Sequence, residues 1–237
     1  MTVRLYVVPA SHPCAAVESA LRMKGVEHKL TELPPGIHAA HQRLRFGRRT
    51  VPAMKAGGEK VSGSLEIMRW LEERHPEPPL WPADPEARAA VERAEQWGDE
   101  VLQGVARRVV FFALRHRPDA MPSFLANSKL PVPAWAARMS GPLTVFIEFR
   151  LNAITEEAVR ADLAALEDHL AKIDGWVEEG VLGGETPNAA DLQIGASLAL
   201  LRTVGDVAEQ VDASRGGELV RRWFGDYPGS VPAGALS

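Results

Sequence analysis

The hydrophobic positions of the first 75 or so residues are spaced as short strands and amphipathic helices in alternation. Apolar or alternating runs bounded by turn residues predict strands over residues 3–8, 26–33, 48–55 and 60–62. Helical spacing predicts helices in the intervals, over residues 13–24, 37–44 and 65–74. The order strand, helix, strand, helix, strand, strand, helix predicts a compact α/β unit.

Beyond residue 85 only the helical period is found. Residues 87–117 predict one long helix, kinked at Gly98 or Gly104. Five prolines between 118 and 142 predict loops and short helices there, and a further helix is predicted over 143–151. The second part of the chain is therefore expected to be entirely helical.

The clearest helical pattern follows Thr155, which is expected to cap it. Its apolar stripe advances in steps of four and three residues from Val159 to Val177, and Gly180 is expected to end it. Asn188 and Asp191 form a capping box with a shortened acid, and the largely apolar helix that follows is expected at the centre of the helical part. A last helix over 218–224 precedes a Gly/Pro-rich tail that is predicted to be mobile.

Composition narrows the class of protein. With 237 residues, 46% hydrophobic and 24% charged, the chain can bury a proper core, and its net charge of −4 does not suggest a nucleic-acid partner. No apolar run is long enough to span a bilayer, and the chain enters a strand directly at its start, so no membrane partner and a cytoplasmic location are expected. The single cysteine excludes an internal disulfide, and no histidine spacing predicts a metal site. The abundance of Ala, Arg and Gly suggests a GC-rich, bacterial genome.

Candidate chemistry is concentrated at the first strand–helix junction, Ser11-His12-Pro13-Cys14. Pro13 suits the first helical position, because its missing N–H would be unpaired there in any case. Ser11 is thereby placed beside a helix N-terminus, where free N–H groups and the helix dipole favour an anion. A hydroxyl held at that point can stabilise a bound thiolate.

Four motifs in this order and spacing resemble the glutathione transferase superfamily, in its serine- or cysteine-type branch. They are Ser11-x-x-Cys14-x-x-Val17 with Gly25, Thr50-Val51-Pro52-Ala53, Gly63-Ser64-Leu65-x-Ile67 leading into Trp70-Leu71, and Asn188-Ala189-Ala190-Asp191. The resemblance implies an α/β plus all-α fold and a homodimer. A thioredoxin-like thiol-binding domain is expected over residues 1–76, a linker over 77–85, and an all-helical substrate-binding domain over 86–237.

The resemblance also implies roles for particular residues. Ser11 lies where the family holds the residue that contacts the glutathione sulfur, with His12 beside it. Pro52 resembles the family's cis-proline, and the Val51 backbone would pair with the cysteinyl amide of glutathione. Ser64, which would otherwise simply cap the helix over 65–74, lies where the family binds the γ-glutamyl carboxylate.

Two departures from the family pattern bear on the thiol. Gly63 occupies a position that is usually acidic and grips the glutamyl ammonium, so Glu66 or an acid of a partner subunit would have to replace that contact. The cosubstrate is accordingly predicted to be glutathione or another low-molecular-weight thiol, with no covalently bound cofactor. In addition, Ser11 stands where redox proteins have the first cysteine of Cys-x-x-Cys, so a dithiol mechanism is excluded.

Three functions are weighed on these residues. The first is a detoxifying transferase in which Ser11 activates the thiol for attack on a hydrophobic electrophile, held in part by Phe112 and Arg115. The second is a non-catalytic ligand-binding or dimerising scaffold of the same fold. The third is a monothiol oxidoreductase acting through Cys14, which as a free cysteine is otherwise expected to be a buried packing residue.

Overall fold

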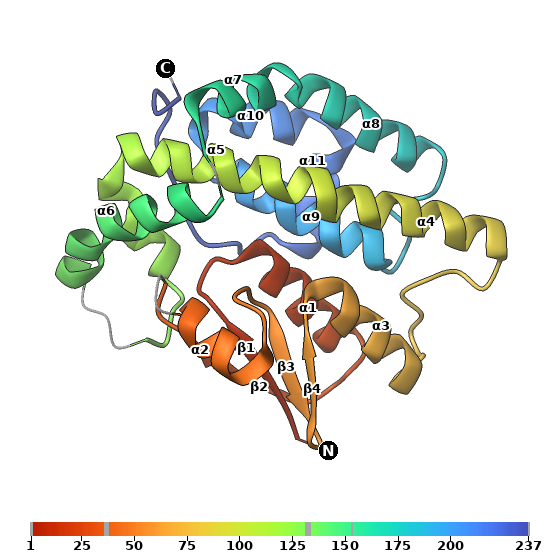
Figure 1. The fold of residues 1–237 in the computed structure, drawn as a ribbon. Coiled ribbons are helices and arrows are strands. Elements are labelled where there is room, and N and C mark those ends of the chain that lie inside the picture. Colours follow the sequence, from red (N-terminus) through yellow and green to blue (C-terminus); the bar gives the residue numbers. More distant parts are fainter. Residues whose placement is uncertain (1, 36–37, 131–133, 153, 237) are drawn as a thin grey trace.

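The N-terminal part of the chain is a four-stranded mixed sheet with three helices (Figure 1). The computed structural model describes residues 2–35, 38–130, 134–152 and 154–236, with only the backbone for 134–140 and 151. The strands lie in the order β2-β1-β3-β4, where β1 is parallel to β2 and antiparallel to β3. Their bounds are Val3–Val7, His28–Glu32, Ala53–Ala56 and Glu59–Ser62 for β1 to β4.

Three helices complete this part: α1 (His12–Met23), α2 (His38–Phe46) and α3 (Ser64–Arg74). Helix α1 begins with Pro13 in its first turn, and Gly25 after its end has a φ of +64°, which favours glycine. In Figure 1, α1 lies between the sheet and the helical layer above it, so it packs on both.

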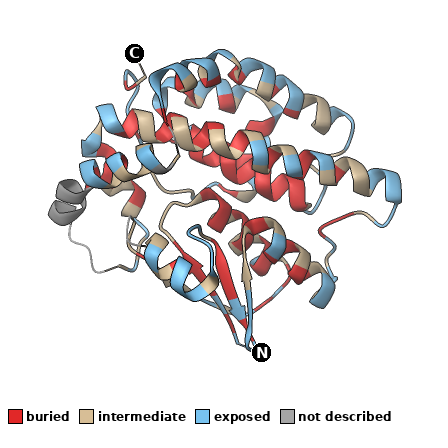
Figure 2. Cartoon of the chain, viewed as in Figure 1, coloured by how far each residue is buried: buried red, intermediate tan, exposed pale blue. Residues whose placement is uncertain are grey.

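The rest of the chain is helical. Helices α4 to α11 span Pro85–Trp97, Gln103–His116, Ala134–Leu151, Glu156–Ala164, Leu166–Glu178, Ala189–Arg202, Gly205–Ala213 and Arg215–Trp223. Every residue of α9 from Ala189 to Leu201 is buried. Figure 2 shows the buried positions concentrated on α9 and α1, which makes α9 the centre of the helical layer, as predicted.

The long helix predicted over 87–117 is confirmed, with its irregularity at Gly98. A π-helical turn, Gly98–Leu102, joins α4 to α5. A Cβ on Gly98 would lie only 2.9 Å from Cγ1 of Ile194 in α9, so glycine allows the long helix to pack closely on the central one.

The prediction for residues 118–142 is wrong in part. A 3₁₀ helix, Pro118–Leu125, does follow α5, but α6 begins at Ala134 and continues through Pro142. Gly141 lies against this 3₁₀ segment, where its Cβ position is 3.4 Å from the Met121 side chain. Packing therefore stabilises a helix that the number of prolines argues against.

Two further differences concern the C-terminal third. The single helix predicted after Thr155 is two, with α7 ending and α8 beginning around Ala165, and α10 was not predicted. The tail predicted to be mobile packs on the body instead: Val231 is buried, and its N–H donates to the carbonyl of Thr203 at 2.7 Å. Buried apolar side chains and paired backbone groups hold it there.

The predicted helix caps agree with the structure at two of three positions. The Thr155 hydroxyl accepts from Ala158 N–H, and Asn188 and Asp191 form the reciprocal capping box of α9. At α3, however, the N-cap is Gly63, and Ser64 is the first helical residue. The predicted Ser64 cap is wrong, and the start of α3 has no side-chain cap.

The Lys24 side chain connects the end of α1 to α3 and to the residues that follow α3. The Lys24 ammonium, whose side chain is fully buried, donates to Glu72 and to the carbonyls of His75 and Pro78. All three of its donors are thus used. The domain boundaries at residues 76 and 85 stay predictions.

Across the described residues, no helix is long and apolar enough to cross a membrane. Within the same residues, no cluster of three or more His, Cys, Asp or Glu side chains is arranged to hold a metal ion.

Candidate functional site

Ser11 lies at the N-terminus of α1, as its N-cap, and its side chain makes no capping hydrogen bond. The residue before it, Ala10, has a φ of +56°, a left-handed conformation that is uncommon for a residue with a side chain. The carbonyl of Ala10 accepts a hydrogen bond from the Tyr227 hydroxyl, so the C-terminal tail holds the loop that presents Ser11.

A cavity of about 370 Å³ opens beside Ser11, between the N-terminal loops and helices α5 and α6. Its walls are largely apolar, and volumes of this size are typical of small-molecule sites. Residues from both parts of the chain line it, among them Ser11, His12, Val51, Arg107, Phe111 and Glu148.

Of the predicted thiol-site residues, Ser11, His12 and Val51 line this cavity, whereas Pro52, Gly63 and Ser64 are not among its lining residues. The Val51–Pro52 peptide is cis, in agreement with the resemblance. Gly63 N–H donates to the Pro52 carbonyl at 3.0 Å, which places the start of α3 beside this proline. Two elements separated in sequence thus meet at the cis-proline.

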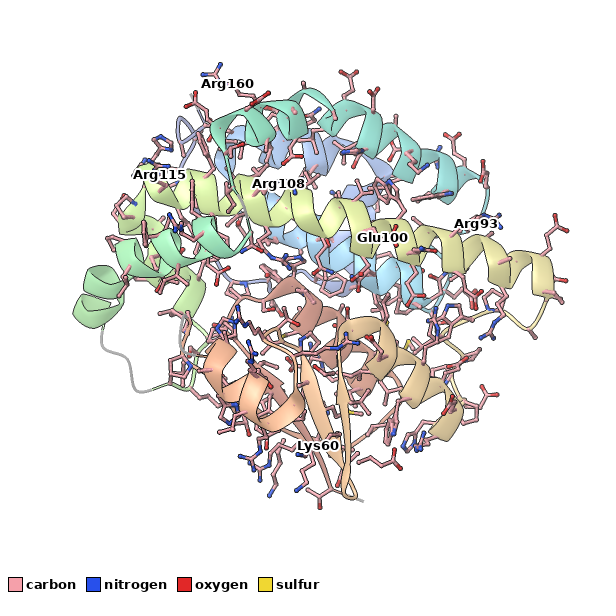
Figure 3. All side chains as sticks on the ribbon, in the orientation of Figure 1. Lys60, Arg93, Glu100, Arg108, Arg115 and Arg160 are labelled. Carbon is pink, nitrogen blue, oxygen red and sulfur yellow. The ribbon has the colours of Figure 1, made fainter. Side chains whose placement is uncertain are left out.

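The two residues predicted for the electrophile pocket do not line the cavity. Phe112 packs on His116, with ring centroids 4.6 Å apart, and Arg115 lies over the Phe149 ring, toward the end of α5 (Figure 3). The residues of α5 that do line the cavity lie on a neighbouring face of the helix: Arg107, Val110, Phe111 and Leu114. Their spacing of three, four and seven residues is a helical face that the sequence could have revealed.

Cys14 is buried one turn into α1, with 4% of its surface exposed. Burial raises the pKa of its thiol to about 12, and hydrogen bonds from the Ser11 side chain and the Val8 backbone lower it only in part. Because the thiolate is the nucleophilic form, burial disfavours reaction of this cysteine at neutral pH. The predicted packing role agrees with this environment, and the oxidoreductase hypothesis does not.

His12 is also buried, at 4% exposure, and its Nε2 has no hydrogen-bond partner among the described residues. Burial and the nearby Arg107 charge lower the pKa of His12 well below its usual value, against a smaller opposing effect of the Gln103 backbone. The ring is therefore neutral at physiological pH.

The carboxylate of Glu66 fills the space beside Gly63. A Cβ built on Gly63 would collide with Oε2 of Glu66, and it would lie 3.3 Å from a guanidinium nitrogen of Arg48. Arg48 and Glu66 form an ion pair at 2.9 Å in which both side chains are about half exposed. An acidic group thus lies beside residue 63, although it comes from Glu66 in the first turn of α3.

Residues 5–79, which contain the sheet, α1, the cis-proline and α3, match the family model for the glutathione S-transferase N-terminal domain. Rat glutathione S-transferase theta-1 is 27% identical over 139 residues, which cover 54% of this chain and 58% of that protein. The N-terminal part of the chain is therefore similar to the N-terminal domain of glutathione S-transferases. The match to the rat protein spans a little over half of that relative's length.

Several solved structures share the fold over almost the whole chain. A glutathione S-transferase from Rhodospirillum rubrum F11 is 18% identical with a TM-score of 0.62, covering 99% of this chain and 98% of its own. FzlA from C. crescentus is 20% identical with a TM-score of 0.64, covering 100% and 98%. A glutathione S-transferase from Methylobacterium radiotolerans, in complex with glutathione sulfonate, is 20% identical with a TM-score of 0.59, covering 98% and 95%. At these identities the likeness shows the fold, a thioredoxin-like part followed by an all-helical one.

Proposed function

We propose that this chain belongs to the glutathione transferase superfamily, and that it activates a small thiol at Ser11 and transfers it to a hydrophobic electrophile. The observation that carries the proposal is the position of Ser11, which lies at the α1 N-terminus, makes no capping hydrogen bond and lines a largely apolar cavity. A hydroxyl in this place can donate to a thiolate, which lowers the pKa of the thiol and raises the fraction of nucleophile at neutral pH.

In the proposed reaction the thiol loses its proton to solvent, and its sulfur is held by the Ser11 hydroxyl. The sulfur lone pair forms a C–S bond with the electrophilic carbon. The electron pair displaced from that carbon departs with a leaving group, or moves to an adjacent carbonyl that is then protonated. The residues of this chain position and desolvate the sulfur, so the effect of Ser11 is electrostatic.

In the proposal, the thiol is bound by the loop that carries the cis-proline and by the start of α3. The Val51 backbone would pair with the cysteinyl amide, next to the cis Val51–Pro52 peptide. Ser64 and the uncapped N–H groups of the first turn of α3 would bind the γ-glutamyl carboxylate. Glu66, whose carboxylate fills the space beside Gly63, would bind the glutamyl ammonium in exchange for Arg48.

Glutathione is the first thiol to test, because the neighbour from M. radiotolerans was solved with glutathione sulfonate. Thermal unfolding of the purified protein with a panel of small thiols is the direct experiment. A ligand at a hundred times its dissociation constant adds about 2.7 kcal/mol of stability. We expect glutathione to raise the melting temperature of the wild type, and oxidised glutathione and a thiol-free buffer serve as controls. If only another thiol raises the melting temperature, the proposed transferase function stands with a different cosubstrate. If no thiol raises it, the proposal is overturned.

The second candidate is a non-catalytic scaffold that keeps the fold without the thiol site. Gly63 is the observation in its favour, because the acid at the family position is missing. Stability that is unaffected by any thiol, together with no thiol transfer, would identify the scaffold. Homodimerisation, the bacterial source, the cytoplasmic location and a role in detoxification stay predictions.

A further inference from the structure

A partly buried guanidinium, that of Arg107, lines the cavity without an ion-pair partner among the described residues. Arg107, in the middle of α5, donates to Oε1 of Gln103 at 2.8 Å and to Oδ1 of Asn152 at 3.3 Å, both neutral acceptors. In the part of the chain that the structure describes, no acidic oxygen lies within ion-pairing distance of it. A guanidinium has five N–H donors, so several of its donors are not used by these two bonds.

The carboxylates nearest to Arg107 are engaged elsewhere. Glu148 also lines the cavity, but its Oε2 accepts from Nδ2 of Asn152 at 2.8 Å. Asp99, below the cavity, accepts from the amides of Gln103 and Gln193. Both charges favour the ionised form of Arg107, whereas burial opposes it, so the guanidinium stays charged without a direct partner.

Two histidines that line the cavity each have one ring nitrogen without a hydrogen-bond partner among the described residues. The atoms are Nε2 of His12 and Nδ1 of His38, and both are buried. These two nitrogen atoms have almost no accessible surface, so they do not contact a ligand in the cavity, and Arg107 is the candidate group for binding an anion. Between the two histidines the walls are apolar, with Val110, Phe111 and Leu114 on the face of α5 that carries Arg107.

We propose that the cavity binds an apolar molecule that carries an anionic oxygen group, a carboxylate or sulfonate, and that Arg107 binds this group. A partly buried charge without an ion-pair partner is costly, and a ligand anion would neutralise it while the apolar body covers the remaining wall. This inference deepens the proposed function, because it makes the electrophile of the transferase an aromatic or aliphatic acid.

Two fluorescent probes with the same ring system test the proposal without any thiol. Anilinonaphthalenesulfonate carries a sulfonate, and N-phenylnaphthylamine is the uncharged parent. We expect the wild type to bind the sulfonate more tightly than the parent. Arg107→Leu should weaken sulfonate binding by about ten-fold or more and leave binding of the parent within about two-fold, as loss of a buried charged hydrogen bond predicts.

Arg115→Leu is the matched control, because Arg115 lies on the same helix, is exposed and does not line the cavity. It should leave both affinities unchanged, which excludes general attraction of the sulfonate to basic surface residues.

Arg107→Lys keeps the charge and should retain part of the preference for the sulfonate. It also provides a second variant if Arg107→Leu does not fold. Equal affinities for the two probes in the wild type, or a preference unchanged in the Arg107 variants, would overturn the inference. Because no thiol is present, that result would leave the proposed role of Ser11 untouched.

Discussion

At the scale of single residues, Ser11 and Cys14 lie within one helical turn, and of the two only Ser11 lines the cavity. We expect Ser11→Ala to lower kcat/KM for glutathione transfer to a generic aromatic electrophile by about 10- to 100-fold near pH 7, because a hydrogen bond to a charged group is worth about 1.5–3 kcal/mol. The loss should shrink at high pH, where the thiolate forms unaided. Steady-state rates across a pH series measure this.

Cys14→Ala is the control for that experiment, because Cys14 is buried and its pKa is raised to about 12. This variant should keep its kcat/KM within about two-fold after any loss of stability is accounted for. Activity that disappears with Cys14→Ala and survives Ser11→Ala would instead favour the oxidoreductase.

Glu66 gives a second prediction at this scale. If its carboxylate replaces the acid missing at Gly63, Glu66→Gln should weaken glutathione binding by about ten-fold or more. Titration calorimetry measures this, and a glutathione analogue without the amino group should bind the wild type and the variant equally. Glu73→Gln, an exposed change on the same helix, is the matched control. Unchanged affinity for glutathione in Glu66→Gln would assign the ammonium to another acid.

At the scale of elements, the start of α9 depends on one buried carboxylate. Asp191 is fully buried and accepts from the backbone N–H of Asn188 at 3.0 Å and of Gly183 at 2.8 Å. We expect Asp191→Ala to lower the free energy of unfolding by about 2–4 kcal/mol, because it removes a cap and leaves two buried donors unpaired. Thr155→Ala, which removes a cap from a more exposed end, should cost about 1 kcal/mol. Urea unfolding compares the two, and equal losses would contradict the special role of the α9 start.

At the scale of the whole molecule, an ion pair between a partly exposed arginine and a buried glutamate joins the N-terminal part to the helical layer. Arg69 of α3 donates to both oxygens of Glu95 of α4, at 3.1 and 2.7 Å, and stacks over the Trp81 ring at 3.8 Å. Burial raises the pKa of Glu95 from 4.5 to about 7, a larger effect than the opposing hydrogen bonds and charge of Arg69.

The sign of the resulting pH dependence follows from this shift. Between pH 4.5 and about 7 the folded state retains a proton that the unfolded state has lost, so the Glu95 contribution to stability falls as pH rises through that window. The slope is about 1.4 kcal/mol per pH unit at its steepest. Relative to Glu95→Gln, the wild type should therefore lose stability from pH 5 to pH 7, as urea unfolding at several pH values can measure. A difference between wild type and variant that does not change with pH would show that Glu95 is ionised throughout.

Features encoded within a few residues could be predicted from the sequence. Strand β1, the Pro13 helix start, the Thr155 cap and the Asn188–Asp191 box depend on local backbone geometry and short-range hydrogen bonds, so their signals lie in adjacent positions. Features that depend on packing could not be predicted in this way. The continuation of α6 through Pro142 depends on contacts with segments far away in sequence.

The features of the candidate site also fall into those that local sequence predicts and those that depend on packing. The sequence by itself determined the superfamily pattern, the fold class and the identity of Ser11, Pro52 and Ser64, because each lies in a short motif at an element boundary. Only the tertiary structure decided which face of α5 meets Ser11, that Glu66 fills the space at Gly63, and that the tail reaches Ala10. These contacts join residues far apart in the chain, and burial of the surfaces around α1 and α9, rather than any local preference, brings them together.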